Sequence, residues 1–404
     1  MLKRTLRYGQ KIFGLLSVLQ QTQDHRTKPQ IPAGAFSTAI LILFLCRMPS
    51  LNALDEYRGQ RSLRRLLRHP LPCGDQIGNV SEVLDLPWLR AALGQMYRQL
   101  GRNKVLQAIR GHRLGVVDGH EINRSYKRCC KECQQREITV NGKKRIQYYH
   151  RAVIFQLVGE GFRFLLDFEL LRPKEDEGTA ALRLLERVLH DHPRSFDILL
   201  GDGLYPQARF FKLLRRHHKH ALVVLKDDRR DVLKDARGLF RHCRQLTYRE
   251  GLTVYQCRDV EDLRSWDSYP EPVRVVQSIE TTTVRERIGH KWHYRKRTTE
   301  WLWVTTLTAS EVPTRTIVRF GHERWRIENE GFNELCNQWH ADHYFRHDAN
   351  SITAFWLILF MAHALFHCFL RNLKPALRAD HTLVYWAQQI LGDFIANRWG
   401  FSSA

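Results

Sequence analysis

The sequence has few features that would place it outside the cytoplasm or in a repeat architecture. It contains no fixed-period repeat and no low-complexity segment, so a solenoid is not expected. Its first residues show no signal-peptide pattern, because basic residues are followed by mixed polarity instead of an apolar core. One stretch, Ala354–Leu370, has no acidic residue, lysine or arginine, but it is slightly short for a membrane span. We predict a buried packing helix there and no membrane association.

Cysteine usage and negative charge are also limited. Nine cysteines without secretory features indicate reduced thiols in a cytoplasm. The 42 acidic residues are outnumbered by 64 lysines and arginines, which gives a net charge of +22. Such an excess favours a polyanionic partner, and nucleic acid is the natural one; the alternative is a soluble basic protein without that partner. At 404 residues the chain exceeds one compact core and predicts two or three units.

The first of these units is mostly helical and covers residues 1–105. An apolar helix is predicted at Ser37–Leu45 and a short basic one at Ser62–Arg68. Short helices with a positive balance suit a DNA-binding head, although no helix-turn-helix signature is present. The alternative is a plain helical cap on the rest of the protein.

The pattern changes to alternating strands and helices over residues 106–226. Three strands come first, and the turn Gly159–Gly161 joins the second to the third as a hairpin. Two further strands then alternate with helices, which gives the order β-β-β-α-β-α-β. The predicted strands are Leu114–Asp118, Tyr148–Val158, Phe162–Leu171, Phe196–Gly201 and Ala221–Leu225, and the helices are Glu177–His190 and Pro206–Arg216.

Residues 227–300 are interpreted as a β-rich insertion, after which a core strand resumes at Trp301–Leu307. Antiparallel strands are predicted at Leu252–Cys257, Val273–Ile279 and Thr282–Ile288. Basic and aromatic residues interleave near the end of the insertion, a pattern that suits phosphate contact and base stacking but also fits a solvated strand face. The candidate DNA-binding residues there are Lys291, Trp292, Arg295 and Arg297, within a wider set that includes Arg285, Arg287, Tyr294 and Lys296.

A glutamate stands out in residues 323–340, which are predicted to form one helix. Trp325, Phe332, Leu335 and Trp339 would then share one stripe, and Glu328 would lie on it. A charge on a core-facing stripe is costly unless a cation meets it. We therefore expect a metal ion or an arginine opposite Glu328.

Two aspartates provide the rest of a candidate metal site. Asp118 and Asp202 each end a short apolar run that reads as a buried strand. Together with Glu328 they form a hard-oxygen ligand set that suits Mg²⁺ or Mn²⁺. The other nearby acids are predicted to have different roles. Glu330 and Glu334 are predicted to be solvated, and Glu175 and Glu177 to act as helix-dipole partners.

A cysteine cluster follows the first predicted strand. Cys129 precedes a Cys130-x-x-Cys133 pair whose spacing fits a zinc knuckle. A second Cys-x-x-Cys is missing, and His120 or His150 would have to complete a structural Zn²⁺ site. The alternative is a reduced cysteine cluster in a hairpin.

These features together resemble a known family. The element order resembles the RNase H-like fold: a mixed sheet flanked by helices, here with a β-rich insertion and an N-terminal helical domain. The phrase Arg324–Glu328 resembles the Arg-Trp-x-Ile-Glu signature of DDE insertion-sequence transposases, and the segments around Asp118 and Asp202 resemble the family's two aspartate motifs. The chain departs from the family at Gly321, where a tyrosine is usual, and at Leu335, where a lysine is usual.

The resemblance implies two-metal phosphoryl transfer on DNA. Asp118 would bridge two Mg²⁺ or Mn²⁺ ions, with Asp202 and Glu328 each holding one. Arg324 and Arg326 are candidate phosphate ligands. The DNA would be the terminal inverted repeats and the target, bound by a homodimer in a synaptic complex, in a bacterial cytoplasm at the nucleoid. Residues 301–375 would complete the catalytic core, and residues 376–404 would form a helical tail.

Two other functions are kept as alternatives. A non-transposing nuclease on the same fold would cut DNA without joining ends. A domesticated DNA-binding protein would have lost catalysis, which the presence of all three acids argues against.

Overall fold

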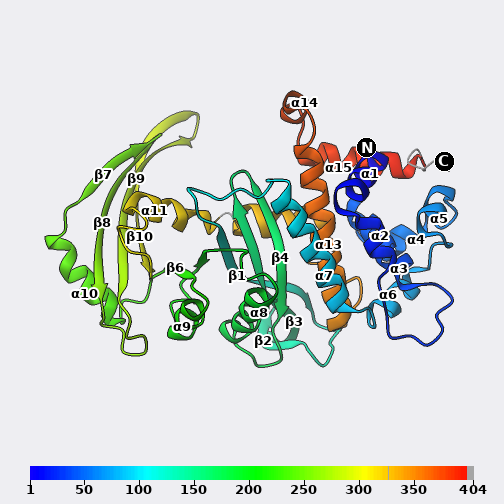
Figure 1. The fold of residues 1–404 in the computed structure, drawn as a ribbon, viewed down its shortest axis with the longest axis horizontal. Coiled ribbons are helices and arrows are strands. Elements are labelled where there is room, and N and C mark those ends of the chain that lie inside the picture. Colours follow the sequence, from blue (N-terminus) through cyan, green and yellow to red (C-terminus); the bar gives the residue numbers. More distant parts are fainter. Residues whose placement is uncertain (326, 398–404) are drawn as a thin grey trace.

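A computed structural model describes residues 1–325 and 327–397, apart from the side chains of residues 288, 329 and 330. A ten-stranded mixed sheet runs through the molecule, with helices on its flanks (Figure 1). The strand order is β2-β3-β1-β5-β6-β10-β9-β8-β7, and β4 pairs with β3 beside β2. The strands are β1 Leu114–Ser125, β2 Gln134–Val140, β3 Lys143–Gly159, β4 Phe162–Leu170, β5 Ile198–Gly201, β6 His220–Val224, β7 Leu246–Glu250, β8 Thr253–Leu263, β9 Val273–Ile288 and β10 Lys291–Thr305.

The centre of this sheet has the order β4-β3-β1-β5-β6. β1 is antiparallel to β3 and parallel to β5, and β5 is parallel to β6. Two amphipathic helices make the crossovers, α8 (Glu177–Asp191) from β4 to β5 and α9 (Ala208–Arg216) from β5 to β6. These central elements follow the predicted β-β-β-α-β-α-β order, with one strand that was not predicted, β2, between β1 and β3 along the chain. The prediction of an RNase H-like mixed sheet flanked by helices is confirmed.

The first strand is longer than predicted. Asp118 does not end it, because β1 continues to Ser125 and pairs with β3 over that whole length. Pairing with β5 stops earlier, at Val116 opposite Leu200. Asp118 therefore lies just beyond the end of β5, on a part of β1 whose β5-facing edge pairs with no described strand. Asp202 directly follows β5 and so lies near the same place.

The β-rich region is continuous with the central sheet. β9 is one strand where two were predicted, and β10 is a single strand that pairs with β9 along the hairpin and with β6 at Trp303–Thr305. The expected boundary at residue 300 thus falls inside β10. α10 (Asp231–Leu239) and the 3-10 turn η1 (Phe240–His242) connect β6 to β7.

A helical layer covers the other end of the sheet (Figure 1). The long helix α13 (Ala349–Arg371) forms its centre and packs on β4, α3 and α7. By length and composition α13 could cross a membrane, but 94% of its most apolar window is buried inside the protein, as predicted for a packing helix. Around it lie α1 Leu2–Phe13, α2 Leu15–Gln20, α3 Ala33–Leu45, α4 Leu51–Asp55, α5 Arg61–Leu67, α6 Gly74–Ser81, α7 Leu86–Arg102, α14 Pro375–Ala379 and α15 Leu383–Ile395.

The N-terminal helices and the C-terminal tail belong to the same layer. The amino group of Met1 forms an ion pair with Asp393, and α1 packs on both α13 and α15. α3 is buried throughout, because its sequence is apolar on every face. Residues 1–105 therefore pack as a helical cap on α13 and β4, whether or not they also contact DNA.

The single helix predicted at 323–340 is wrong. α11 (Thr314–Glu323) ends before it, a π-helical turn η2 follows at Ile327–Phe332, and α12 occupies Asn333–Trp339. A π turn holds one more residue than an α turn and so shifts every later side chain around the axis. Such turns are frequent at functional sites.

Candidate active site at the first two parallel strands

Asp118 lies on β1 and faces the segment that contains η2. The Nη1 of Arg324 donates to Asp118 Oδ2 at 3.2 Å, and the N–H of Gly119 donates to Oδ1 at 2.9 Å. Two residues along the same face of β1, the ring of His120 stacks on Phe332 with 4.6 Å between centroids. The segment from Arg324 to Phe332 therefore runs along this face of β1, past Asp118.

Asp202 directly follows β5, on the strand next to β1. Its Oδ1 accepts the backbone N–H of Leu204 at 2.8 Å, which fixes the turn after the strand. Burial raises the pKa of Asp118 to about 7; Asp202 and Glu177 add to that shift, and the Arg324 guanidinium opposes it. The two aspartates are thus close enough for their charges to interact, as expected for acids on neighbouring strands.

Glu177 was predicted to be a helix-dipole partner, and it does occupy the first turn of α8, but it also makes side-chain contacts that the sequence did not indicate. It is the first residue of α8, yet it is buried, and Tyr205 Oη donates to its Oε1 at 2.9 Å. Arg151 Nη2 lies 2.6 Å from Oε2 as an ion pair. Burial raises the pKa of Glu177, and the charge of Asp202 raises it further. No sequence spacing relates Glu177 to the aspartates, because the fold alone places the start of α8 there.

Glu177 reaches β1 on the face opposite to Asp118. A Cβ at Gly119 would lie 2.1 Å from Glu177 Oε2, so only glycine leaves room for this carboxylate. Successive residues of a strand point to opposite faces. Asp118 and the η2 segment therefore share one face of β1, and Glu177 packs on the other.

Glu328 is not on a buried stripe, which corrects the argument that singled it out. The π turn leaves Ile327, Phe332 and Leu335 buried and Glu328 exposed. Within the described part of the chain, Glu328 has no hydrogen bond or ion pair. It still lies between Arg324, which contacts Asp118, and Phe332, which contacts His120. Arg326, the other predicted phosphate ligand, is outside the described residues.

The two departures from the family pattern have structural explanations. A side chain at Gly321 would collide with the indole of Trp303, whose Cε2 lies 2.4 Å from an ideal Cβ position. The space available to the usual tyrosine is therefore filled by an aromatic ring from β10. Leu335, in the place of the usual lysine, is 1% exposed and belongs to the hydrophobic core.

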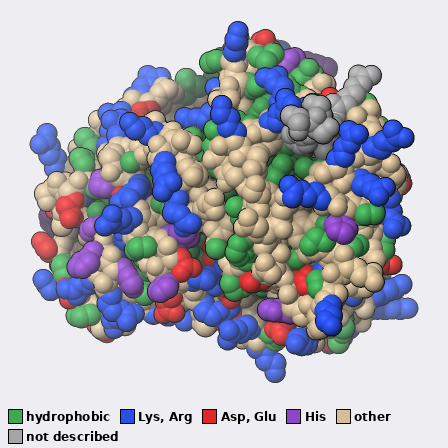
Figure 2. Space-filling model, turned by 45° about the vertical axis from the view of Figure 1, so that its right-hand side comes forward, with side chains coloured by type: hydrophobic (Ala, Val, Ile, Leu, Met, Phe, Trp, Pro, Cys, Tyr) green, Lys and Arg blue, Asp and Glu red, His purple; other side chains and the backbone are tan. Residues whose placement is uncertain are grey.

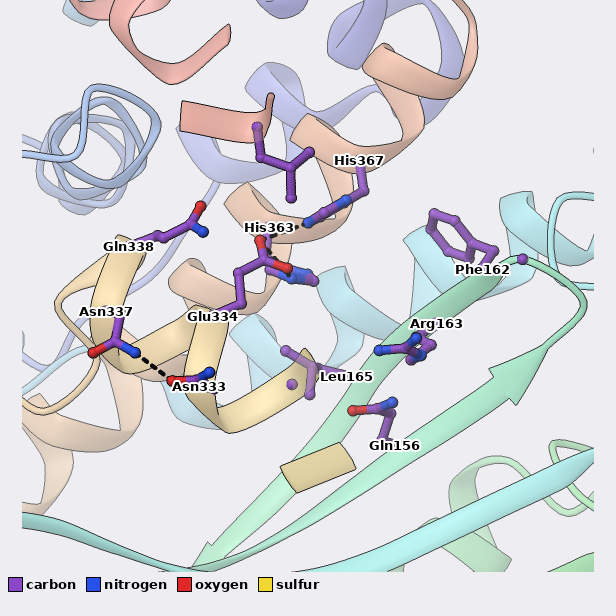
Figure 3. Close-up of a pocket in the computed structure, with 13 residues that line it drawn as sticks. Gln156, Phe162, Arg163, Leu165, Asn333, Glu334, Asn337, Gln338, His363 and His367 are labelled. Atoms are coloured by element: carbon purple, nitrogen blue, oxygen red, sulfur yellow. Dashed lines mark hydrogen bonds and ion pairs between the residues drawn. The ribbon is translucent and has the colours of Figure 1, made fainter. Parts of the chain in front are cut away.

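Glu334 was predicted to be solvated, and this is wrong. Its Oε1 accepts hydrogen bonds from Trp339 Nε1 at 3.0 Å and from His367 Nε2 at 2.8 Å, and His363 Nε2 lies 3.6 Å away (Figure 3). Glu334, His363 and His367 line a cavity of about 550 Å³ that is also bounded by Gln156. The three could hold a metal ion by proximity, but the carboxylate is already hydrogen-bonded within the protein.

The predicted DNA-binding residues of the insertion lie on the β9–β10 hairpin and are exposed throughout. The alternation of β10 divides them: Trp292 and Tyr294 are on one face, and Lys291, Arg295 and Arg297 are on the other. The guanidinium of Arg285 lies over the ring of Trp292, 4.2 Å from its centroid. Basic side chains also outnumber acidic ones on the face drawn in Figure 2.

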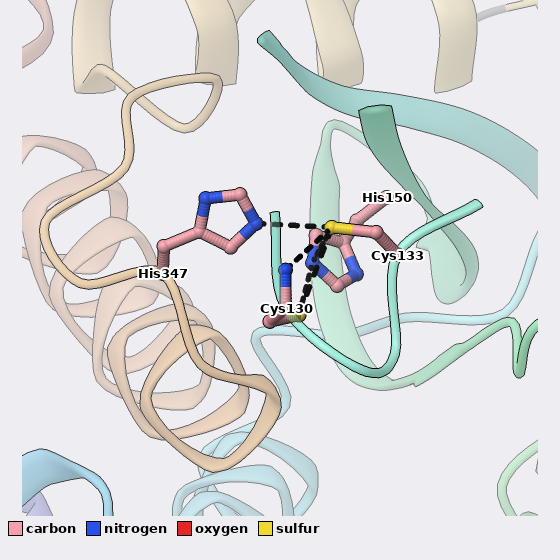
Figure 4. A group of neighbouring side chains, drawn as sticks. All are labelled: Cys130, Cys133, His150 and His347. Carbon is pink, nitrogen blue, oxygen red and sulfur yellow. Dashed lines mark hydrogen bonds between the residues drawn. The ribbon is translucent and has the colours of Figure 1, made fainter. Parts of the chain in front are cut away.

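The cysteine cluster is assembled differently from the prediction. Cys130 and Cys133 lie together with His150 of β3 and with His347, which precedes α13 (Figure 4). Cys129 is exposed and outside the group. His120 is also outside it, because its Nε2 contacts Cys336 Sγ at 3.2 Å. The sequence suggested His150 as one alternative, but His347 was not considered.

An RNase H-like sheet with interacting carboxylates on neighbouring strands is the arrangement of a nucleotidyl-transfer enzyme. A family model described as the transposase DDE domain matches residues 109–365, more than half of the chain, and the protein belongs to that family. This confirms the family that the Arg324–Glu328 phrase suggested. No curated protein matches the chain.

Proposed function

We propose that this transposase acts for an insertion sequence: it binds the terminal inverted repeats, cleaves DNA strands there and transfers the 3′-OH ends to target DNA. Family membership supports the class of activity. The observation that carries the proposal is the pair Asp118 and Asp202, which interact at the uncovered edge of β1 and β5 with Arg324 beside them.

We assign Glu328 as the third acid. It lies in the π turn between Arg324, which contacts Asp118, and Phe332, which contacts His120, and its carboxylate has no partner among the described residues. Glu177 has both carboxylate oxygens engaged, by Tyr205 and Arg151, and approaches β1 from the other face. Glu177 therefore has a structural role, as the ion-pair partner of Arg151 at the start of α8, whereas Glu328 is available to bind a ligand.

The residues fit a divalent cation. Asp118 is a half-buried carboxylate whose pKa is raised by burial and, to a smaller extent, by two neighbouring carboxylates, so a cation bound there would stabilise its charged form. Carboxylate oxygens suit Mg²⁺ or Mn²⁺. When bound, two such ions would activate the attacking water or 3′-OH and stabilise the leaving oxygen. Asp118, Asp202 and Glu328 would hold them.

Other residues would position the DNA. The guanidinium of Arg324, released from Asp118 when cations bind that carboxylate, is available to a phosphate oxygen. The exposed β9–β10 hairpin presents basic side chains that could contact the DNA backbone and aromatic rings that could stack on nucleobases. A homodimer would hold two ends together in the synaptic complex. The protein would act at the nucleoid of a bacterial cytoplasm.

Isosteric substitutions of the three acids test this proposal. Asp118→Asn, Asp202→Asn and Glu328→Gln should each lower strand cleavage of a labelled element end by at least about 1,000-fold, because only metal-binding charge is lost. End binding, measured by mobility shift without metal, should be retained. Glu330→Gln is the control and should cleave nearly normally. Normal cleavage by Glu328→Gln would remove Glu328 from the site, and cleavage without end joining by the wild type would favour the nuclease alternative.

A further inference from the structure

The four-residue group formed by Cys130, Cys133, His150 and His347 has the composition of a structural zinc site. Two sulfurs and two imidazole nitrogens are a common tetrahedral donor set for Zn²⁺. The ligand atoms of all four lie within 4.8 Å of one another. Cys133 and His150 are buried, whereas Cys130 and His347 are half-buried, so the group is closed on one side and accessible on the other.

The distances agree with a tetrahedral centre. Zinc bonds of about 2.3 Å to sulfur and about 2.05 Å to nitrogen imply about 3.8 Å between two sulfurs and about 3.6 Å between a sulfur and a nitrogen. The two Sγ atoms are 3.7 Å apart, and His150 Nε2 lies 3.4 Å from Cys130 Sγ and 3.5 Å from Cys133 Sγ. His347 Nε2 is nearer to Cys133 Sγ, at 3.0 Å, so this ring would move outward by roughly 0.6 Å.

The orientation of the imidazole rings also supports a metal site. Both rings turn Nε2 to the sulfurs. A buried polar group aimed at a thiol gains little from that weak contact. The N–H of Cys130 also donates to Cys133 Sγ at 3.3 Å, which would stabilise a thiolate.

We propose that Cys130, Cys133, His150 and His347 bind one structural Zn²⁺ ion. The site would join three segments: the loop between β1 and β2, strand β3, and the segment between α12 and α13. Cys133 and His347 are separated by 214 positions, so the ion would close a very long loop. It would fasten the segment after α12 to the sheet and thereby help to hold the η2 turn beside β1.

Zinc content of the full-length protein tests the assignment. Protein purified under reducing conditions without a metal-affinity tag should contain about one zinc per chain. Co²⁺ exchanged into the site should give the absorption spectrum of tetrahedral sulfur and nitrogen coordination. A zinc chelator should lower the melting temperature, because binding energy at such a site contributes to folding. These readouts are independent of DNA cleavage and hence of the proposed active site.

Matched variants locate the ligands. Cys130→Ser and His347→Ala should lose zinc, whereas Cys129→Ser and His343→Ala, which change neighbouring exposed residues of the same types, should retain it. Cys130 and His347 are chosen because they are half-buried and tolerate substitution better than Cys133. If a variant does not fold, Co²⁺ titration of metal-stripped wild type gives the same answer. Zinc-free wild type that melts identically with and without chelator, a Cys130–Cys133 disulfide in the reduced preparation, or loss of zinc from Cys129→Ser would overturn the proposal.

Discussion

Two glutamates in one short segment have opposite surroundings. Glu328, in the π turn η2, is exposed and has no described partner, although its neighbours contact Asp118 and His120. Glu334, in α12, is half-buried and accepts hydrogen bonds from Trp339 and His367. An α-helical periodicity predicts the reverse for both residues. The π turn accounts for the exchange, because it rotates the residues that follow it relative to those before it.

This comparison distinguishes Glu334, an acid with a structural role, from Glu328, an acid that is available to bind a ligand. The surroundings of Glu334 lower its pKa: hydrogen bonds and charges from His363 and His367 favour the carboxylate and outweigh the opposing effect of burial. That carboxylate is therefore charged and held by hydrogen bonds within the protein. Among the described residues Glu328 has no such partner, and its segment runs past Asp118, which fits the proposal that its partner is a metal ion.

The largest effect on stability is expected from removing the structural acid. Glu334→Ala should lower the free energy of unfolding by about 3 kcal/mol, because it leaves the imidazoles and the indole N–H of Trp339 without their half-buried acceptor. Glu328→Ala, the matched control, should change it by less than about 0.5 kcal/mol. Denaturant unfolding of both variants without metal measures the difference. Equal losses would contradict the assignment of the two roles.

A smaller effect is expected at Arg324, which is 5% exposed and lies over the ring of Trp325. Arg324→Lys should lower cleavage by about 10-fold, or about 1.4 kcal/mol, with little loss of end binding, because lysine lacks the planar fork. The structure shows Asp118, not Glu328, as the partner of Arg324. If Arg324 only neutralises Asp118, Arg324→Lys should instead lower the melting temperature, Asp118→Asn should restore it, and cleavage by Arg324→Lys should stay normal. Comparing the melting temperatures of the two single variants and the double variant, alongside cleavage rates, decides between these roles.

An effect of similar size concerns acid stability at the Glu334 cluster. Burial lowers the pKa of His363 from 6.5 to about 4; His367 and Arg47 add to the shift, and Glu334 opposes it. The unfolded chain binds a proton at His363 at a higher pH than the folded protein does. The stability contributed by the neutral imidazole is therefore fully present above pH 6.5 and is lost as the pH falls towards 4. We expect a loss of about 1–2 kcal/mol between pH 7 and pH 5, and His363→Gln should flatten that slope. An unchanged slope in this variant would indicate that His363 is protonated in the folded protein.

The sequence predicted the fold better than the site. The order of strands and helices along the central part of the chain follows from apolar runs and turn signals, and so do α8, α9 and the burial of α13. Asp118 and Asp202 were singled out as candidates for the same reason, since each follows an apolar run. The actual length of β1 was missed, because its extension beyond Asp118 is polar and is stabilised by pairing with β3.

The remaining errors concern contacts between distant segments. Helical periodicity cannot show a π turn, so the surroundings predicted for Glu328 and Glu334 were the reverse of those observed. The burial of Glu177 depends on Gly119, on a different element, and His347 joins the cysteine cluster only because the fold brings the start of α13 to the β1–β2 loop. Such contacts leave no local spacing in the sequence.

The central claim is that Glu328 is a metal ligand, and a change of metal preference tests it most directly. Glu328→Cys replaces an oxygen ligand with a sulfur, which Mg²⁺ binds poorly and Mn²⁺ accepts more readily. We expect this variant to cleave element ends hardly at all with Mg²⁺ and to recover substantially with Mn²⁺, whereas Glu177→Cys should show no selective recovery. Equal activity of Glu328→Cys in both metals, or selective Mn²⁺ recovery in Glu177→Cys instead, would contradict the account.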